Sequence, residues 1–266
     1  MTTVQHVASH HWHVPARPFT VHTEDGVRIE GTRLGPPGTD RTALIFAHGL
    51  MGWHRKPRFA VFAEQLSEWF TVYALDMRGH GESGGTCDFG GAEIYDIDAV
   101  LQLVRRVGHQ RVITVGTSMG GIATIRHAGL LGGSDEVVAI SSLAHWDWHD
   151  GAHPKAKRAF QARVGTVPGR AALRAWGVRL PEEWEEPESP ESVIGKIGPT
   201  PVVIVHGADD QLFCEDHAHR LYDAANEPKR LLIGQGFGHA EDGLTPAFAR
   251  RLAGMMHEEL DLPWSE

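Results

Sequence analysis

The 266-residue sequence contains only two cysteines, Cys87 and Cys214, and they fall in unrelated segments. A disulfide framework is therefore not expected, and the low cysteine content fits a reducing cytoplasm. No apolar run approaches the roughly 20 residues that a membrane-spanning helix needs. Residues 1–18 lack the apolar core of a secretory signal. The sequence thus predicts a cytoplasmic protein without a membrane span.

The chain also lacks an excess of basic residues. Its 25 Lys and Arg against 34 Asp and Glu give a net charge of −9, which argues against a nucleic-acid partner. Histidine is frequent, with 18 residues that are scattered apart from clusters at 10–13 and 145–153. Neither cluster has a known zinc-ligand spacing or a cysteine pair, so no metal site is expected there.

The hydrophobic pattern predicts an α/β fold with a mostly parallel central sheet. Residues 19–35 alternate apolar and polar side chains on both sides of Asp25-Gly26, which is typical of a β-hairpin. Apolar strand-like runs then alternate with amphipathic helical segments. The expected strands lie at 42–49, 71–79, 111–116, 136–143, 201–207 and 229–234, and the expected helices at 56–70, 92–108, 119–131, 215–225 and 246–260. Such repeats place helices on both faces of the sheet.

Residues 144–200 interrupt this alternation. They contain a basic stretch and an acidic, proline-rich stretch that cannot form one regular helix. About sixty residues are too many for a simple loop, so we expect a cap of short helices inserted into a single domain that spans residues 1–266. The tryptophans of this segment either line a partly apolar substrate site or pack the cap onto the sheet. They are Trp146, Trp148, Trp176 and Trp184.

Ser118 lies in the sequence Gly116-Thr117-Ser118-Met119-Gly120, between an apolar strand and a helical segment. A serine between glycines at such a turn is typical of a nucleophile elbow, in which the strained backbone leaves no room for side chains at the flanking positions. The alternative is an ordinary strand-to-helix turn, because glycine and serine are common in turns. A serine nucleophile also needs a base, an acid that orients the base, and donors for an oxyanion.

Later strand ends can supply the base and the acid. Asp209 and Asp210 follow the strand at 201–207, and His239 follows the strand at 229–234. The carboxyl ends of parallel strands lie at one edge of a sheet, so these side chains can meet Ser118 there. The order serine, aspartate, histidine is the order expected when a nucleophile elbow is paired with later strand ends.

The strand at 42–49 ends in His48-Gly49-Leu50, close to the same edge of the predicted sheet. The glycine lets the backbone bend, so the N–H groups of Leu50 and Met119 are the expected oxyanion donors. His48 is an alternative base, but a His-Gly pair directly after a strand more often shapes the loop itself.

Over nearly its whole length the sequence resembles the α/β-hydrolase superfamily. It is most similar to the branch that contains serine aminopeptidase-type hydrolases, monoacylglycerol lipases and small esterases. The matching segments are HGLMG at 48–52, DMRGHGESGG at 76–85, GTSMGG at 116–121, GADDQLF at 207–213 and GFGH at 236–239. The family pattern implies Asp210 as the triad acid, with Asp209 beside it. Some relatives carry the acid after the sixth strand, where this chain has Asp147.

The resemblance implies a serine hydrolase that needs neither a metal nor an organic cofactor. Ser118, His239 and Asp210 would cleave an ester of a small, partly apolar acyl substrate through an acyl-enzyme. A thioesterase, a C–C bond hydrolase or an acyltransferase would use the same triad, since the fold does not select the leaving group. A non-catalytic ligand-binding relative is the alternative outside enzymes. The resemblance also implies that Arg78 and His80 belong to a structural turn rather than to a phosphate or metal site.

Overall fold

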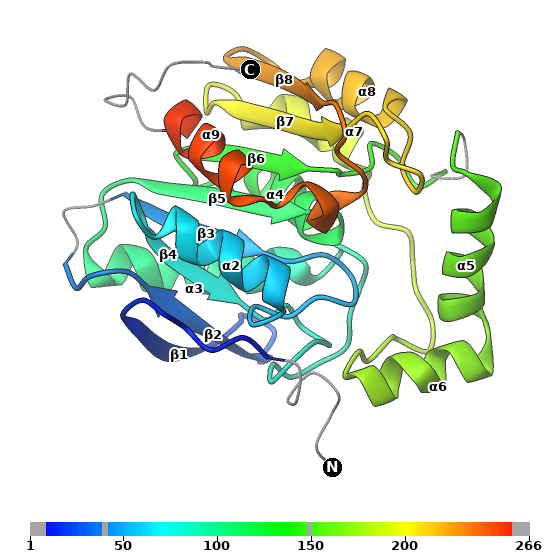
Figure 1. Cartoon of the computed structure of the whole chain (residues 1–266), viewed down its shortest axis with the longest axis horizontal. Coiled ribbons are helices and arrows are strands. Elements are labelled where there is room, and N and C mark those ends of the chain that lie inside the picture. Colours follow the sequence, from blue (N-terminus) through cyan, green and yellow to red (C-terminus); the bar gives the residue numbers. More distant parts are fainter. Residues whose placement is uncertain (1–8, 39–41, 148–150, 257–266) are drawn as a thin grey trace.

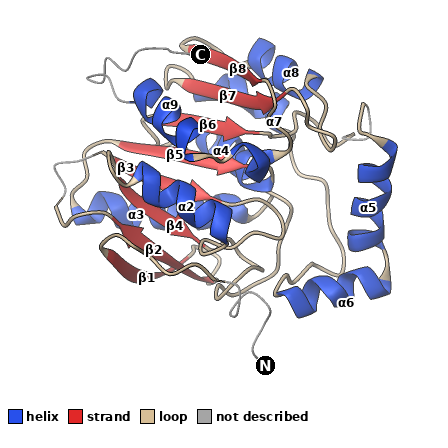
Figure 2. Cartoon of the chain, in the orientation of Figure 1, coloured by secondary structure: helices blue, strands red, loops and turns tan. Residues whose placement is uncertain are grey.

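An eight-stranded sheet runs through the part of the chain that the computed structural model describes, residues 9–38, 42–147 and 151–256 (Figures 1 and 2). The strands are β1 (Ala16–His22), β2 (Arg28–Leu34), β3 (Ala43–Ala47), β4 (Thr71–Leu75), β5 (Val112–Thr117), β6 (Glu136–Ile140), β7 (Val202–Gly207) and β8 (Lys229–Gly234). Their order in the sheet is β1-β2-β4-β3-β5-β6-β7-β8. The pairs β1–β2 and β2–β4 are antiparallel and the other neighbours are parallel, which confirms the predicted hairpin and mostly parallel sheet.

Helices cover both faces of the sheet (Figure 1). On one face lie α2 (Pro57–Leu66) and α9 (Pro246–Met256). On the other lie α3 (Glu93–Val107), α4 (Met119–Leu130), α7 (Pro190–Ile194) and α8 (Asp216–Ala224). Strands β3 to β7 are buried along their whole length between these helices. This two-sided burial explains why their sequences are almost continuously apolar.

The segment 144–200 connects β6 to β7 and contains α5 (Pro154–Gly165), α6 (Val167–Trp176), α7 and the short helix η1 (Gly195–Ile197). Helices α5 and α6 lie beyond the carboxyl ends of the parallel strands (Figure 1). The ring of Trp176 meets that of Trp53 edge-on, with centroids 6.0 Å apart. The indole of Trp184 contacts Trp146 and donates to the carbonyl of Asp88 at 3.1 Å. These three tryptophans therefore pack the segment against the sheet domain, whereas Trp148 lies outside the described residues.

The described residues bear on two expectations from composition, the absence of a disulfide framework and the absence of a membrane span. Cys87 is buried and Cys214 is half-buried, and both are free thiols. Within the described ranges, no helix is both long enough and apolar enough to cross a membrane. Residues 257–260, at the end of the last expected helix, lie outside the described part of the chain.

Candidate active site

Ser118 occupies a sharp turn between β5 and α4. Its backbone has φ 52° and ψ −117°, a conformation that residues with a side chain rarely adopt. The Ser118 N–H donates to the carbonyl of Ile140 on β6 at 2.8 Å, and the Ser118 carbonyl accepts from the N–H of Ile122 at 3.0 Å. These bonds fix the strained turn, so the serine stands at the carboxyl end of β5, where α4 begins.

Gly116 and Gly120 flank Ser118 at positions where no side chain fits. A Cβ on Gly116 would lie 2.1 Å from the carbonyl oxygen of Gly120. A Cβ on Gly120 would lie 2.4 Å from the carbonyl oxygen of Ala47, at the end of β3. Since these oxygens belong to the backbone, they cannot move aside without shifting α4 against the sheet. The elbow sequence thus follows from the close approach of α4 to β3 and β5.

Replacing Gly120 with alanine is expected to lower the free energy of unfolding by about 2–3 kcal/mol, the usual cost of overpacking. The measurement is urea unfolding followed by circular dichroism. Gly165, at the end of α5, is the matched control, because a Cβ added there meets no atom within 4 Å. Gly165→Ala should leave stability unchanged or slightly raise it. An unfolding midpoint for Gly120→Ala equal to that of the wild type would contradict this account of the elbow.

The structure brings the side chains of Ser118, His239 and Asp210 into one hydrogen-bonded row. His239 Nε2 lies 2.9 Å from Ser118 Oγ, and His239 Nδ1 lies 2.7 Å from Asp210 Oδ2. An ionised carboxylate only accepts hydrogen bonds, so the imidazole carries its proton on Nδ1 and accepts the serine hydroxyl at Nε2. This is the arrangement in which an imidazole can take a proton from a serine hydroxyl.

Burial and two backbone hydrogen bonds fix the side chain of Asp210 beside the imidazole of His239. Its side chain is fully buried, and its Oδ1 accepts the N–H groups of Leu212 at 2.8 Å and Phe213 at 2.9 Å. Burial acts to raise the pKa of Asp210, but the hydrogen bond and charge of His239 and the Phe213 N–H hold that pKa below its usual value. The carboxyl group is therefore ionised at neutral pH and faces His239.

The other candidate acids do not face His239 in this way. Asp209 is exposed, although its N–H donates to the carbonyl of Phe237 at 3.0 Å. Asp147, after β6, is also exposed. Of the three aspartates considered from the sequence, Asp210 is the one whose carboxylate bonds the imidazole.

The expected oxyanion donors lie on the two segments that meet at Ser118. Met119 is the first residue of α4, so its N–H has no acceptor within the helix. Leu50 follows Gly49, whose backbone passes so close to the elbow that an added Cβ would lie 3.0 Å from Ser118 Cβ. The Gly49–Gly52 turn is closed by a bond from the N–H of Gly52 to the carbonyl of Gly49 at 2.9 Å. Both segments can thus present N–H groups beside the serine.

Comparison with known proteins agrees with this arrangement of strands and strand ends. A model of the alpha/beta hydrolase family matches residues 44–262. The chain belongs to the alpha/beta hydrolase family. The narrower assignment to the serine aminopeptidase-type branch stays a prediction.

Relatives of this hydrolase include uncharacterized proteins of two bacteria. YfhR of Escherichia coli is 28% identical over 231 residues, which cover 84% of this chain and 72% of YfhR. YqkD of Bacillus subtilis is 28% identical over 229 residues, with the same coverage of each chain. Among solved structures, the esterase Pf2001 of Pyrococcus furiosus superposes with a TM-score of 0.73 at 20% identity, and the match covers 91% of this chain and 92% of the esterase. At that identity the superposition shows a shared fold.

Two buried histidines support the turn that carries Leu50. His48 Nε2 accepts the N–H of Met77 at 3.0 Å, and its Nδ1 donates to the carbonyl of Gly49 at 2.8 Å. His80 Nε2 accepts the N–H of Met51 at 3.3 Å, and its Nδ1 donates to the carbonyl of Arg78 at 3.0 Å. Both rings are thus neutral and fully engaged, which excludes His48 as the base that serves Ser118 in this arrangement.

We expect these two histidines to make the native fold of the hydrolase sensitive to acid. Burial lowers the pKa of His48 to about 4 and that of His80 to about 3. Below pH 6.5 these imidazoles become protonated in the unfolded chain but stay neutral in the native protein. The free energy of unfolding therefore falls as the pH decreases toward 4. Each histidine contributes a slope that approaches about 1.4 kcal/mol per pH unit.

Urea unfolding between pH 7 and pH 4.5 measures this dependence. His80→Gln should make the slope shallower, whereas His11→Gln, at an exposed position, should leave it unchanged. The same slope for His80→Gln and the wild type would mean that His80 is protonated in the native protein.

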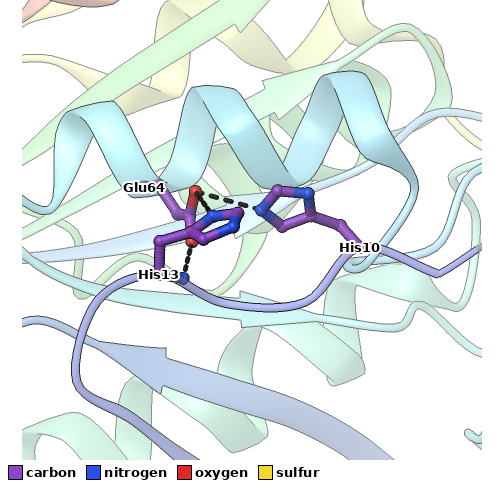
Figure 3. A group of neighbouring side chains, drawn as sticks. All are labelled: His10, His13 and Glu64. Carbon is purple, nitrogen blue, oxygen red and sulfur yellow. Dashed lines mark hydrogen bonds and ion pairs between the residues drawn. The ribbon is translucent and has the colours of Figure 1, made fainter.

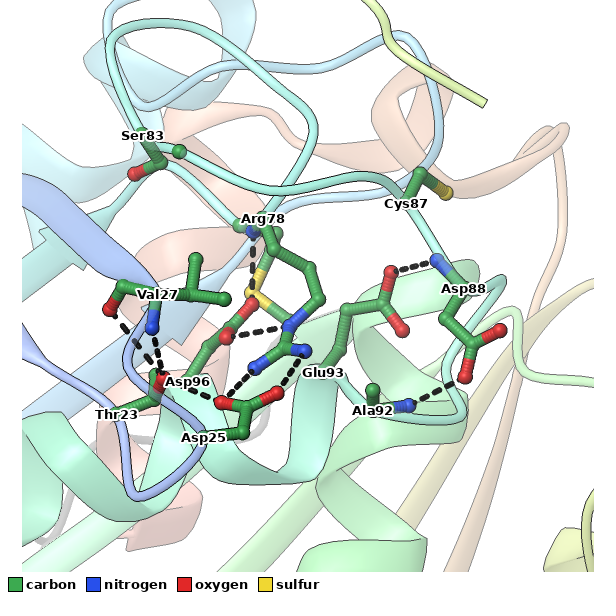
Figure 4. Close-up of polar contacts among 12 residues, drawn as sticks. Thr23, Asp25, Val27, Arg78, Ser83, Cys87, Asp88, Ala92, Glu93 and Asp96 are labelled. Atoms are coloured by element: carbon green, nitrogen blue, oxygen red, sulfur yellow. Dashed lines mark hydrogen bonds and ion pairs between the residues drawn. The ribbon is translucent and has the colours of Figure 1, made fainter. Parts of the chain in front are cut away.

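Ion pairs and hydrogen bonds of Arg78 hold the segment 76–85 against the β1–β2 turn and α3 (Figure 4). The guanidinium donates to both carboxylate oxygens of Asp25, at 2.7 and 3.0 Å, and to Asp96 Oδ1 at 2.8 Å. Asp25 lies in the β1–β2 turn and Asp96 on α3. Glu93, also on α3, accepts the N–H groups of Asp88 and Gly90. Arg78 is thus occupied by two carboxylates, which agrees with a structural turn.

Two residues that were not singled out from the sequence, His206 and Phe213, contact the row of Ser118, His239 and Asp210. His206 donates from Nε2 to the carbonyl of Phe213 at 2.9 Å and lies 3.6 Å from Asp210 Oδ2. Burial lowers the pKa of His206, so the ring is neutral there. The ring of Phe213 meets that of His239 edge-on, with centroids 5.0 Å apart. For His206, the sequence signal was its position directly before Gly207, at the end of β7.

Proposed function

We propose that this chain is a serine hydrolase that cleaves carboxylic esters of small, partly apolar acyl substrates. Ser118 Oγ attacks the ester carbonyl while His239 Nε2 takes its proton, and Asp210 holds the imidazole in the required tautomer. The N–H groups of Leu50 and Met119 stabilise the oxyanion. His239 then protonates the leaving alcohol, and a water molecule deprotonated by the same imidazole releases the acid from Ser118.

The observation that carries this proposal is the continuous hydrogen bonding from Asp210 through His239 to Ser118 on a strained elbow. A strained backbone conformation persists only where the surrounding structure enforces it, and such conformations are typical of functional sites. A ligand-binding protein without catalysis needs neither the strained serine nor a buried carboxylate behind the imidazole. Pf2001, which shares this fold, is an esterase, which supports the same reaction class for this chain.

The surroundings of His239 favour a substrate with an apolar acyl group. A cavity of about 540 Å³ lies beside the imidazole, between α5 and the loops after β7 and β8. Its apolar lining comes from Ala156, Ala159 and Phe160 of α5 and from Leu212 of the β7 loop. Polar and charged side chains line the rest of it, namely Arg163, Asp209, Gln211 and Asp242. Ile122, Leu143 and Phe213 form a further apolar cluster, with Trp146 packed against it. In this proposal the segment 144–200 acts as a cap that encloses the acyl group.

A panel of p-nitrophenyl esters from acetate to decanoate tests the proposal, with an acyl thioester of matched chain length as a parallel substrate. We expect turnover of the oxygen esters, with kcat/KM falling for chains too long for the cavity. A higher kcat/KM for the thioester would identify a thioesterase instead. Absence of turnover for every ester in the panel would contradict the proposed function.

A further inference from the structure

Residues 9–15, the described residues before β1, lie against α2 and the turn that precedes it, where backbone and side-chain contacts fix them. The N–H of His10 donates to the carbonyl of Arg55 at 2.8 Å, and the Arg55 Nε donates back to the carbonyl of His10 at 3.0 Å. The ring of Trp12 stacks on that of His54, with centroids 6.1 Å apart. Three residues further along the segment from His10, the N–H of His13 donates to Glu64 Oε1. This docking brings two histidines to the same carboxylate.

His10, His13 and Glu64 direct their side chains toward one another (Figure 3). His10 Nε2 lies 3.0 Å from Glu64 Oε2, and His13 Nδ1 lies 3.4 Å from the same oxygen. One ligand-type atom from each of the three residues lies within 4.8 Å of the other two. Bonds of about 2.0–2.1 Å from a tetrahedral zinc ion would separate its ligand atoms by about 3.3 Å. The separations from Glu64 Oε2 are therefore close to those of a coordination tetrahedron.

We propose that His10, His13 and Glu64 form a binding site for one divalent ion of the zinc type, which clamps the N-terminal segment to α2. Two imidazole nitrogens and one carboxylate oxygen are ligands that zinc accepts, and water would complete the tetrahedron. Two neutral imidazoles and one carboxylate leave a bound Zn²⁺ with a local charge of +1. The proposed reaction at Ser118 does not use this site.

The burial of the three side chains suits a site that is ordered yet accessible. The side chains of Glu64 and His10 are 10% and 14% exposed, so their positions are set by the packing around them. The side chain of His13 is 73% exposed and leaves a path for the ion from solvent. His10 also meets the rings of Trp12 and His13 edge-on, which restrains the orientation of its imidazole.

Calorimetric titration of the untagged 266-residue chain with ZnCl₂ after chelator treatment tests the site. We expect one equivalent to bind the wild type. His10→Ala and Glu64→Gln should each weaken that binding by at least about 10–100-fold, the loss that removal of even an outer partner of a ligand causes. His11→Ala is the matched control, because it removes an exposed histidine from the same segment and should leave the binding unchanged.

Thermal unfolding provides the second readout, because an ion that binds only the native state raises Tm. Zn²⁺ should raise Tm for the wild type and for His11→Ala, and should not raise it for His10→Ala or Glu64→Gln. Glu64→Gln keeps an oxygen that can accept the N–H of His13, so this variant retains the docking of the segment. No binding by the wild type, or equal binding by all variants, would overturn the proposed site.

Discussion

Replacing Ser118 with alanine should reduce kcat/KM for a p-nitrophenyl ester by about 10⁴-fold or more, by analogy with other triads. The reason is that Ser118 Oγ, 2.9 Å from His239 Nε2, is the nucleophile of the proposed reaction. Alanine keeps the Cβ of the strained elbow and removes a single non-hydrogen atom, Oγ, so Tm should stay close to that of the wild type. Initial rates and thermal unfolding measured on the same preparation separate lost chemistry from lost folding.

Ser192→Ala is a suitable control for this experiment. Ser192 is exposed, and its hydroxyl donates to the carbonyl of Ser189, at the start of α7. Its replacement should leave kcat/KM unchanged. Turnover by Ser118→Ala at the wild-type rate would remove Ser118 from the mechanism, whatever its geometry.

Replacing Asp210 with asparagine should lower kcat by about 10³–10⁴-fold, because the amide no longer selects the required imidazole tautomer. An Asn side chain facing Nδ1 through its NH₂ group makes that nitrogen an acceptor, and Nε2 then carries the proton that would block Ser118. The carbonyl oxygen of the new amide can still accept the N–H of Leu212, so the loop after β7 should keep its shape. Steady-state kinetics on purified, folded protein measures the effect.

The neighbouring position provides a stringent control for this variant. Asp209→Asn changes the same charge one residue earlier, at an exposed position that lines the cavity beside His239. Because Asp210 supplies the carboxylate that bonds the imidazole, Asp209→Asn should lower kcat far less than Asp210→Asn does. Asp147→Asn should likewise retain activity. A greater loss for Asp209→Asn or Asp147→Asn than for Asp210→Asn would assign the acid to another residue.

The strands could be predicted from sequence because burial on two faces leaves a clear signal. The runs expected at 42–49 and 201–207 correspond to β3 and β7, whose residues are all buried. The ends of the helices were less predictable. The helix expected at 56–70 ends at Leu66, where the hydroxyl and N–H of Ser67 both bond to the carbonyl of Glu64. Such local side-chain bonds compete with continued helix and carry little sequence signal.

The positions of the candidate active-site residues were also predictable, since each follows a strand of one parallel sheet. Ser118, Asp210 and His239 therefore meet even though up to 121 residues separate them in sequence. Contacts that depend on how a loop or terminal segment docks left no such signal. Glu64 is a residue of the amphipathic α2, 51 positions from His13, and nothing in its spacing indicates that two histidines approach it.

Labelling with a fluorophosphonate probe followed by peptide mass spectrometry tests most directly whether Ser118 is an activated nucleophile. The reaction needs no knowledge of the natural substrate. We expect one adduct, on the peptide that contains Ser118, and strongly slowed labelling in His239→Ala, because His239 deprotonates the attacking hydroxyl. An adduct on a different residue, or a wild-type protein that stays unlabelled while folded, would contradict the account.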